Sequence, residues 1–156
     1  MAELDLRWFD NPEDERQLKQ LVDSIDVLDA NNLSSNDVRQ LLDVFERFPD
    51  DDGFESFWGI VHVLERAGGY ESALVDSVLR SPGEFNLMMI NRLLNGGIKH
   101  AGDQSLLSLL EDVARSARGN PNPARLAKHF VEYQRNKTLS DAAENPAICA
   151  CCNVRF

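Results

Sequence analysis

The chain has 156 residues, of which 43% are hydrophobic and 27% charged, a composition and length that suit one globular domain. Its formal net charge of -10 is concentrated in residues 1–55, where 16 Asp and Glu accompany 5 Lys and Arg, whereas residues 56–156 hold 10 acidic and 11 basic residues. This charge disfavours direct binding to nucleic acid or to an anionic membrane surface, and no apolar run approaches the roughly 20 residues that cross a bilayer.

The first two predicted helices lie in this acidic third. Asn11 as a cap, Pro12 at the first helical position and acids after it predict a helix start there. Ser34 and Asp37 resemble a capping box and predict the start of the next helix. Apolar residues then recur at helical spacing in two stripes, which are Leu18, Leu21, Val22, Ile25 and Leu28, followed by Val38, Leu41, Leu42, Phe45 and Phe48.

Five further helices are predicted, and no segment shows a convincing alternating strand pattern. We therefore expect an all-α fold with a single domain over residues 1–137 and a flexible tail over 138–156. Pairing of successive helices, with the last helix alone, would give either a short HEAT-like solenoid or an irregular bundle. The five helices span residues 54–67, 70–79, 84–94, 103–118 and 122–136.

Acidic side chains outside the apolar stripes are the candidate binding residues, and we expect the first two helices to present theirs on exposed faces. A concentrated negative field attracts a basic protein surface and raises the rate of encounter with it. The alternative is a solvated face that only keeps the protein in solution. The predicted partner-binding residues are Asp23, Asp26, Asp43, Glu46, Asp50, Asp51, Asp52 and Glu55.

No pattern in the sequence indicates catalysis, so we expect a protein that is not an enzyme and carries no metal or cofactor. His62 lies between two valines and reads as a partly buried structural histidine rather than an acid, a base or a ligand. The run Asp50–Glu55 lacks the alternating ligands of a calcium loop. No glycine pair has the spacing of a phosphate loop, and no serine lies in a nucleophile elbow.

The two ends of the sequence bear on location. Acidic residues follow Met1 where a signal peptide would be basic, so we expect a cytoplasmic protein. Cys149, Cys151 and Cys152 all fall in the predicted tail and cannot crosslink the domain as a secreted framework would. We expect this tail to be disordered rather than to bind a metal, because a zinc site normally needs four ligands.

Three segments carry a resemblance to a known family: residues 57–65 (FWGIVHVLE), then Tyr70 with Leu74 and Ser77, then residues 91–97 (NRLLNGG). Across about residues 35–115 the chain resembles small all-helical immunity proteins that are encoded beside bacterial polymorphic toxins, including contact-dependent growth inhibition systems. The resemblance implies that the protein binds and neutralises one cognate toxin domain, often a nuclease with a basic cleft. It implies no catalytic residues.

Two other functions stay open from the sequence. The first is a helical-repeat adaptor that joins two cellular proteins and neutralises no toxin. The second is a small helical enzyme or metal protein that uses His62 with acidic neighbours.

Overall fold

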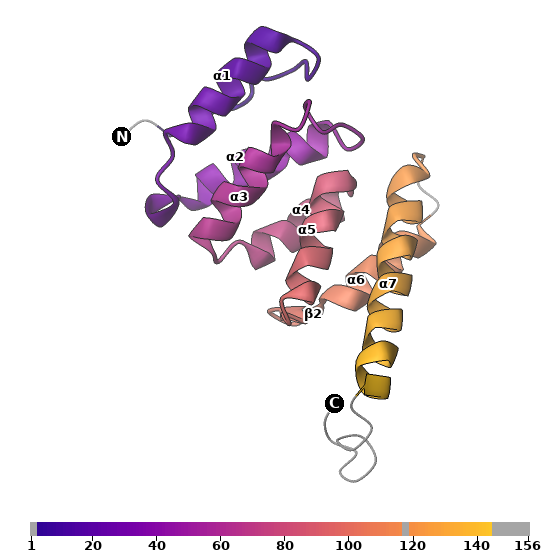
Figure 1. The fold of residues 1–156 in the computed structure, drawn as a ribbon. Coiled ribbons are helices and arrows are strands. Elements are labelled where there is room, and N and C mark those ends of the chain that lie inside the picture. The colour runs from indigo at the N-terminus through magenta and orange to yellow at the C-terminus, as the bar shows by residue number, and fades with distance from the viewer. Residues whose placement is uncertain (1–2, 117–118, 145–156) are drawn as a thin grey trace.

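The computed structural model describes residues 3–116 and 119–144, and within these ranges the fold is all-α, with seven α-helices and one two-stranded hairpin. The predicted fold class is therefore confirmed. No helix in the described ranges is long and apolar enough to cross a membrane. In chain order the elements are α1 (Glu15–Asp26), the 3-10 turn η1 (Ala30–Asn32), α2 (Ser35–Arg47), α3 (Phe57–Ala67), α4 (Glu71–Arg80), α5 (Glu84–Asn95), β1 (His100–Ala101), β2 (Gln104–Ser105), α6 (Leu106–Arg115) and α7 (Asn122–Glu144) (Figure 1).

Several predicted helix ends are wrong. α1 begins at Glu15 because the Asp14 carboxylate, not Asn11, accepts hydrogen bonds from the backbone N–H groups of the first turn. The small β1–β2 hairpin was not predicted, and it delays the start of α6 to Leu106. α7 continues to Glu144, beyond the predicted end near Asn136. The remainder of the predicted tail, including its cysteines, lies outside the described residues.

The capping box of α2 is confirmed in full. The Ser34 hydroxyl accepts from the N–H of Asp37 at 3.0 Å, and the Asp37 carboxylate accepts from the N–H of Ser34 at 3.0 Å. Two N–H groups that the helix itself leaves unpaired are thereby satisfied. A local sequence pattern therefore sets where α2 begins.

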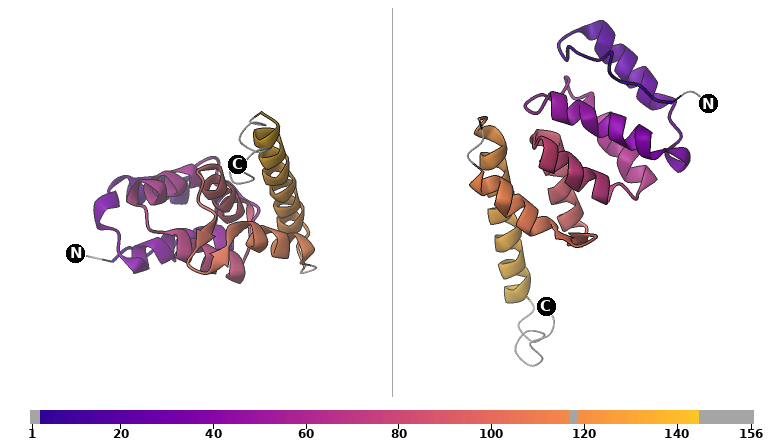
Figure 2. Two further views of the ribbon diagram at one scale, coloured as in Figure 1. Left: turned by 90° about the horizontal axis from the view of Figure 1, so that it is seen from below. Right: turned by 180° about the vertical axis from the view of Figure 1, so that it is seen from behind.

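The helices do not pair strictly with their neighbours in sequence. α1 packs against α3, and α2 packs against α4, so the first four helices form two layers as in a helical solenoid (Figure 2). The predicted pairing of α5 with α6 occurs, but the most extensive contact is between α6 and α7. The prediction that the last helix stands alone is wrong, because α7 packs against both α6 and α5.

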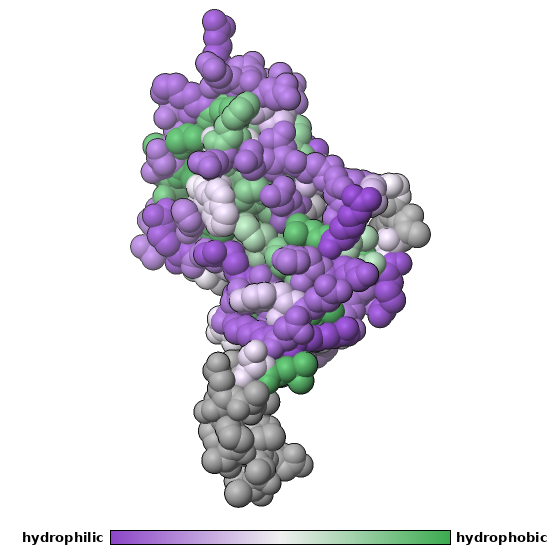
Figure 3. Space-filling view, turned by 45° about the vertical axis from the view of Figure 1, so that its right-hand side comes forward, coloured by the Kyte–Doolittle hydropathy of each residue, from purple (hydrophilic) through white to green (hydrophobic). Residues whose placement is uncertain are grey.

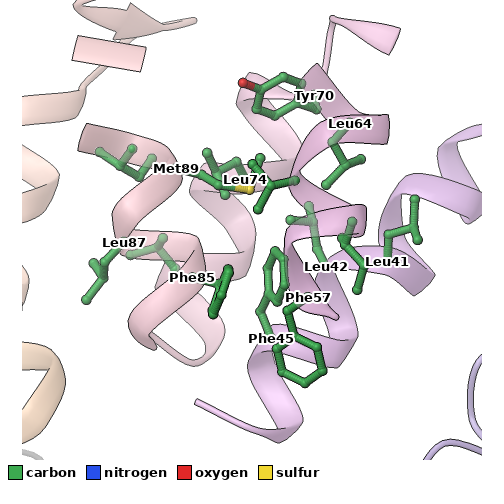
Figure 4. Packing of buried hydrophobic residues seen from close by; sticks show 14 of the residues in the cluster. Leu41, Leu42, Phe45, Phe57, Leu64, Tyr70, Leu74, Phe85, Leu87 and Met89 are labelled. Carbon is green, nitrogen blue, oxygen red and sulfur yellow. The ribbon is translucent and has the colours of Figure 1, made fainter. Parts of the chain in front are cut away.

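Three phenylalanine rings lie at the centre of the core and join α2, α3 and α5 (Figure 4). The ring centroids of Phe45 and Phe57 are 5.9 Å apart, those of Phe45 and Phe85 5.2 Å, and those of Phe57 and Phe85 5.7 Å. We call these three residues the aromatic cluster. All three side chains are at most 4% exposed, and each ring has the edge-to-face, tilted or stacked geometry that adds to the hydrophobic gain.

A polar network fastens α2 to α4. Arg80 donates two hydrogen bonds to the Glu46 carboxylate, at 2.8 and 3.0 Å, and Ser77 donates a third at 2.9 Å. Arg39 adds an ion pair at 3.1 Å. The buried amide of Asn86 then donates to the Ser77 hydroxyl at 3.2 Å. The side chain of Glu46 is only 8% exposed, so this carboxylate depends on its donors for the solvation that water would otherwise give.

The segment before α1 is fastened to α2 by Arg47. Its guanidinium donates to the carbonyl oxygen of Phe9 and, at 3.1 Å, to that of Leu6. The same guanidinium donates to the Asp43 carboxylate at 2.7 Å. Leu6 and Phe9 are fully buried, so this ion pair positions two core residues that lie outside any helix.

We expect Glu46→Ala to lower the free energy of unfolding by about 2 to 3 kcal/mol, because it leaves two arginines and a buried hydroxyl without their acceptor. Thermal unfolding followed by circular dichroism measures this as a fall in Tm of roughly 4 to 12 °C. Asp23→Ala is the matched control. Asp23 pairs with Lys19 on the exposed face of α1, and its loss should cost about 0.5 kcal/mol or less. Equal effects of the two changes would contradict the structural role of Glu46.

Candidate protein-binding site

The structure separates the eight predicted acidic residues into three groups. Asp23 and Asp26 are exposed on α1, as expected. Asp43 and Glu46 were expected on an exposed face of α2, and this is wrong. The side chain of Asp43 is 28% exposed and pairs with Arg47, and Glu46 belongs to the buried network between α2 and α4. The remaining four carboxylates lie together in the connection between α2 and α3.

We call residues 50–55 in this connection the acidic loop. Its backbone has three consecutive residues at positive φ: Gly53 at 56°, Phe54 at 49° and Glu55 at 70°. Only glycine adopts this conformation without cost, whereas for Phe54 and Glu55 it costs roughly 1 to 2 kcal/mol each. The loop thus keeps a conformation that its own sequence disfavours.

Hydrogen bonds inside the loop stabilise this turn. The Asp51 carboxylate accepts from the N–H of Gly53 at 2.7 Å, and the Asp52 carboxylate accepts from the N–H of Phe54 at 3.0 Å. Asp side chains commonly close turns in this way, by bonding to the backbone two residues on. The N–H of Ser56 donates to the carbonyl oxygen of Gly53 at 2.9 Å and leads the chain into α3.

The loop is also fixed at its base. Gly53 is buried against the Phe57 ring of the aromatic cluster, where a Cβ atom would lie only 2.5 Å from a ring carbon. At the other end, Asp50 accepts from the side-chain amides of Asn120 at 2.7 Å and Asn122 at 3.4 Å, which ties the loop to the start of α7. The N–H of Glu84 donates to the Pro49 carbonyl at 2.7 Å and ties it to the start of α5.

Phe54 is the residue that sequence reasoning missed. Its side chain is 72% exposed, although most large apolar residues of the described chain are buried. An aromatic side chain that is both strained and exposed contributes little to folding, and such strain is concentrated at binding and catalytic sites. The sequence carried a weak signal, because Phe54 follows Gly53 directly within an otherwise charged run.

The carboxylates around Phe54 have no cationic partner within the described ranges. Asp50 accepts from neutral amides, Asp51 and Asp52 from backbone N–H groups, and no ion pair is formed by Glu55. Glu84 at the start of α5 adds a fifth carboxylate, which sequence reasoning also missed. Burial raises the pKa of Glu84 above its usual value, and the nearby charges of Asp52, Asp50 and Asp51 raise it further.

An open pocket of about 250 Å³ lies beside the acidic loop, between the starts of α5 and α7. It is lined by two acidic residues, Asp50 and Glu84, by Asn122, and by two apolar residues, Pro123 and Leu126. In Figure 3, where the right-hand side of Figure 1 is turned forward, hydrophobic areas lie between hydrophilic residues on this face of the molecule.

The other candidate residues do not form a comparable site. His62 was expected to be partly buried, but it is exposed and lies against Trp58, with ring centroids 5.9 Å apart. In the part of the chain that the structure describes, no three His, Cys, Asp or Glu residues are grouped so that they could hold a metal ion. Cys149, Cys151 and Cys152 lie outside that part.

Comparisons with protein-family models, with curated proteins and with solved structures gave no match.

We expect Phe54→Asn to leave the free energy of unfolding unchanged or to raise it by about 0.5 to 1 kcal/mol, because Asn tolerates positive φ better than Phe. Chemical unfolding measures the change. Val27→Asn is the control, since Val27 is 82% exposed but has a φ of -88°. A clear loss of stability in Phe54→Asn alone would mean that the Phe54 ring supports the fold.

The raised pKa of Glu84 gives stability a pH dependence of known sign. From pH about 4 upward, the folded protein retains the Glu84 proton longer than the unfolded chain does, so ionisation of this group lowers stability as pH rises. Glu84→Gln removes this contribution. We therefore expect the Tm of the variant, relative to the parent, to rise between pH 4 and pH 7, by about 1 to 2 °C. A relative Tm that falls over this range would contradict the raised pKa.

Proposed function

We propose that this protein is an immunity protein that binds a basic toxin domain through the acidic loop and neutralises it by covering its active cleft. The observation that carries the proposal is Phe54, an exposed aromatic residue held at positive φ within a group of carboxylates that form no ion pair with any described residue. The resemblance of residues 35–115 to immunity proteins supplies the class of partner.

The arrangement around Phe54 has the anatomy of a protein interface. Binding energy is usually concentrated in a few aromatic or arginine side chains near the centre, surrounded by a polar rim. Here Phe54 would insert into an apolar depression on the partner. Asp51, Asp52 and Glu55, which form no ion pair with a described residue, would form the rim and meet cationic side chains of the partner.

The charge distribution supports a basic partner. A nuclease domain binds phosphate groups and so presents Lys and Arg around its cleft. An inhibitor with carboxylates on a fixed loop meets that surface with complementary charge, which accelerates association and disfavours acidic proteins. The exposed carboxylates of α1, including Asp23 and Asp26, would add to this long-range field.

The identity of the partner can be tested directly. The purified protein serves as bait in a low-salt pull-down from cells of its source, and bound proteins are identified by mass spectrometry. We expect one basic toxin domain, whose activity falls to background when the protein is added in equimolar amount. Recovery of several cellular proteins without a toxin, or a toxin that stays active in the complex, would contradict the proposal and favour an adaptor.

Variants of the loop test which residues bind. We expect Phe54→Asn to weaken the complex by about 30-fold, the size of a typical hot spot. The double change Asp51→Asn and Asp52→Asn keeps both turn-closing oxygens, and we expect it to weaken binding about tenfold at low salt and to reduce the salt dependence. Binding is measured by calorimetry at several salt concentrations.

The matched control is Asp23→Asn with Asp26→Asn, which removes the same charge from α1. Its effect should stay within about threefold, because these residues act only through the long-range field. If the α1 variant weakens binding as much as the loop variants, the contact surface lies elsewhere.

A further inference from the structure

We propose that the pocket beside the acidic loop receives a single cationic side chain, Arg or Lys, from the bound protein. The inference deepens the proposed function and rests on it for the identity of the protein that supplies the side chain. The pocket lies between the starts of α5 and α7, and the charge pattern of the sequence does not indicate this position.

The lining of the pocket matches the two parts of such a side chain. Pro123 and Leu126 offer an apolar surface to the methylene groups, and Asp50 and Glu84 offer carboxylates to the cation. Long cationic side chains normally bind in this way, with the stem against apolar atoms and the head against charge. At about 250 Å³ the pocket is below the usual range for drug-sized ligands and suits one side chain.

The polar groups of the pocket are already positioned to receive a cation. Asn120 and Asn122 hold the Asp50 carboxylate but bring no positive charge. The Glu84 side chain forms no hydrogen bond or ion pair with any described residue. Its burial, and then the nearby charges of Asp52, Asp50 and Asp51, raise its pKa and so disfavour its ionisation. A guanidinium or ammonium group would relieve this repulsion.

The dipoles of α5 and α7 disfavour a cation in the pocket, but their effect is smaller than that of the carboxylates. Glu84 is the first residue of α5 and Asn122 the first of α7, so both helix N-termini direct partial positive charge toward the pocket. Each is equivalent to about half an elementary charge. Together they offset roughly one of the four carboxylate charges of Asp50, Asp51, Asp52 and Glu84, so the pocket stays negative.

The test uses small probes and does not need the cognate partner. Nα-acetyl-arginine methylamide and the corresponding lysine compound are titrated into the isotope-labelled protein at constant ionic strength, and backbone amide shifts are followed by NMR. The neutral probe is Nα-acetyl-citrulline methylamide, which has nearly the same shape as the arginine compound. We expect saturable shifts centred on Asp50, Glu84, Asn122 and Leu126 with the cationic probes, and none with citrulline.

A pair of variants separates the pocket from the general acidic field. Glu84→Gln changes the lining, whereas Asp52→Asn removes one nearby charge without touching it. We expect Glu84→Gln to weaken binding of the arginine probe by about three- to tenfold, and Asp52→Asn to weaken it less. The Tm of each variant verifies that it folds, and the citrulline comparison on the parent protein does not depend on either.

Three outcomes would contradict the proposal that the pocket binds a cationic side chain. These are equal shifts with arginine and citrulline, shifts spread evenly over α1 and the acidic loop, or equal effects of the two variants. These outcomes are independent of the pull-down. A protein that binds the arginine probe in the pocket but captures no toxin keeps the pocket and loses the proposed function. Capture of a toxin by a protein that does not bind the arginine probe would support the proposed function and contradict the cation pocket.

Discussion

Packing of the aromatic cluster is the constraint on which the rest of this structure depends. Phe45, Phe57 and Phe85 come from three helices, and their contacts fix where α2 ends, where α3 begins and where the first turn of α5 lies. These three points surround the acidic loop. The chain passes so close to α5 that a Cβ atom on Gly83 would lie 2.7 Å from the backbone of Pro49. The loop has little room to move unless the cluster itself moves, and close-packed cores resist such movement.

The stability of this core offsets two local features that are unfavourable by themselves. One is the backbone conformation of Phe54 and Glu55, which only the surrounding structure maintains. The other is the mutual repulsion of loop carboxylates that form no ion pair in the part of the chain that the structure describes. Glu46 is a carboxylate that stabilises the fold, because it accepts hydrogen bonds from two arginines, Arg39 and Arg80, and from a serine hydroxyl. Local features that are unfavourable for folding are expected at functional sites, and here the positive φ of Phe54 and Glu55 occurs in the same loop as the grouped carboxylates.

Sequence reasoning predicted what depends on local pattern. The stripe of α2 and its capping box are encoded within a few residues, and they agree with the structure. Val22 was predicted in a buried stripe but is 37% exposed, because the width of a buried face depends on what packs against it. The fate of Glu46 depends on Arg80, which lies 34 residues away, and no periodicity indicates such a pairing. The loop carboxylates were predicted from their charge, but the exposure of Phe54 and the nearness of Glu84 are tertiary properties.

In the proposed complex the carboxylates of the acidic loop and the Phe54 ring have separate roles, and both depend on the loop being held in place. A flexible loop of six residues would lose conformational freedom on binding, and that loss would subtract from the affinity. Here Phe57, Asn120 and Asn122 already hold the loop at both ends in the free protein, so binding costs it less conformational freedom. The carboxylates then act mainly on the rate of association, through a field that salt weakens. Phe54 acts mainly on the rate of dissociation, because removing a buried ring from the partner exposes apolar surface that salt does not screen. A complex built in this way would form fastest at low salt and still dissociate slowly at high salt.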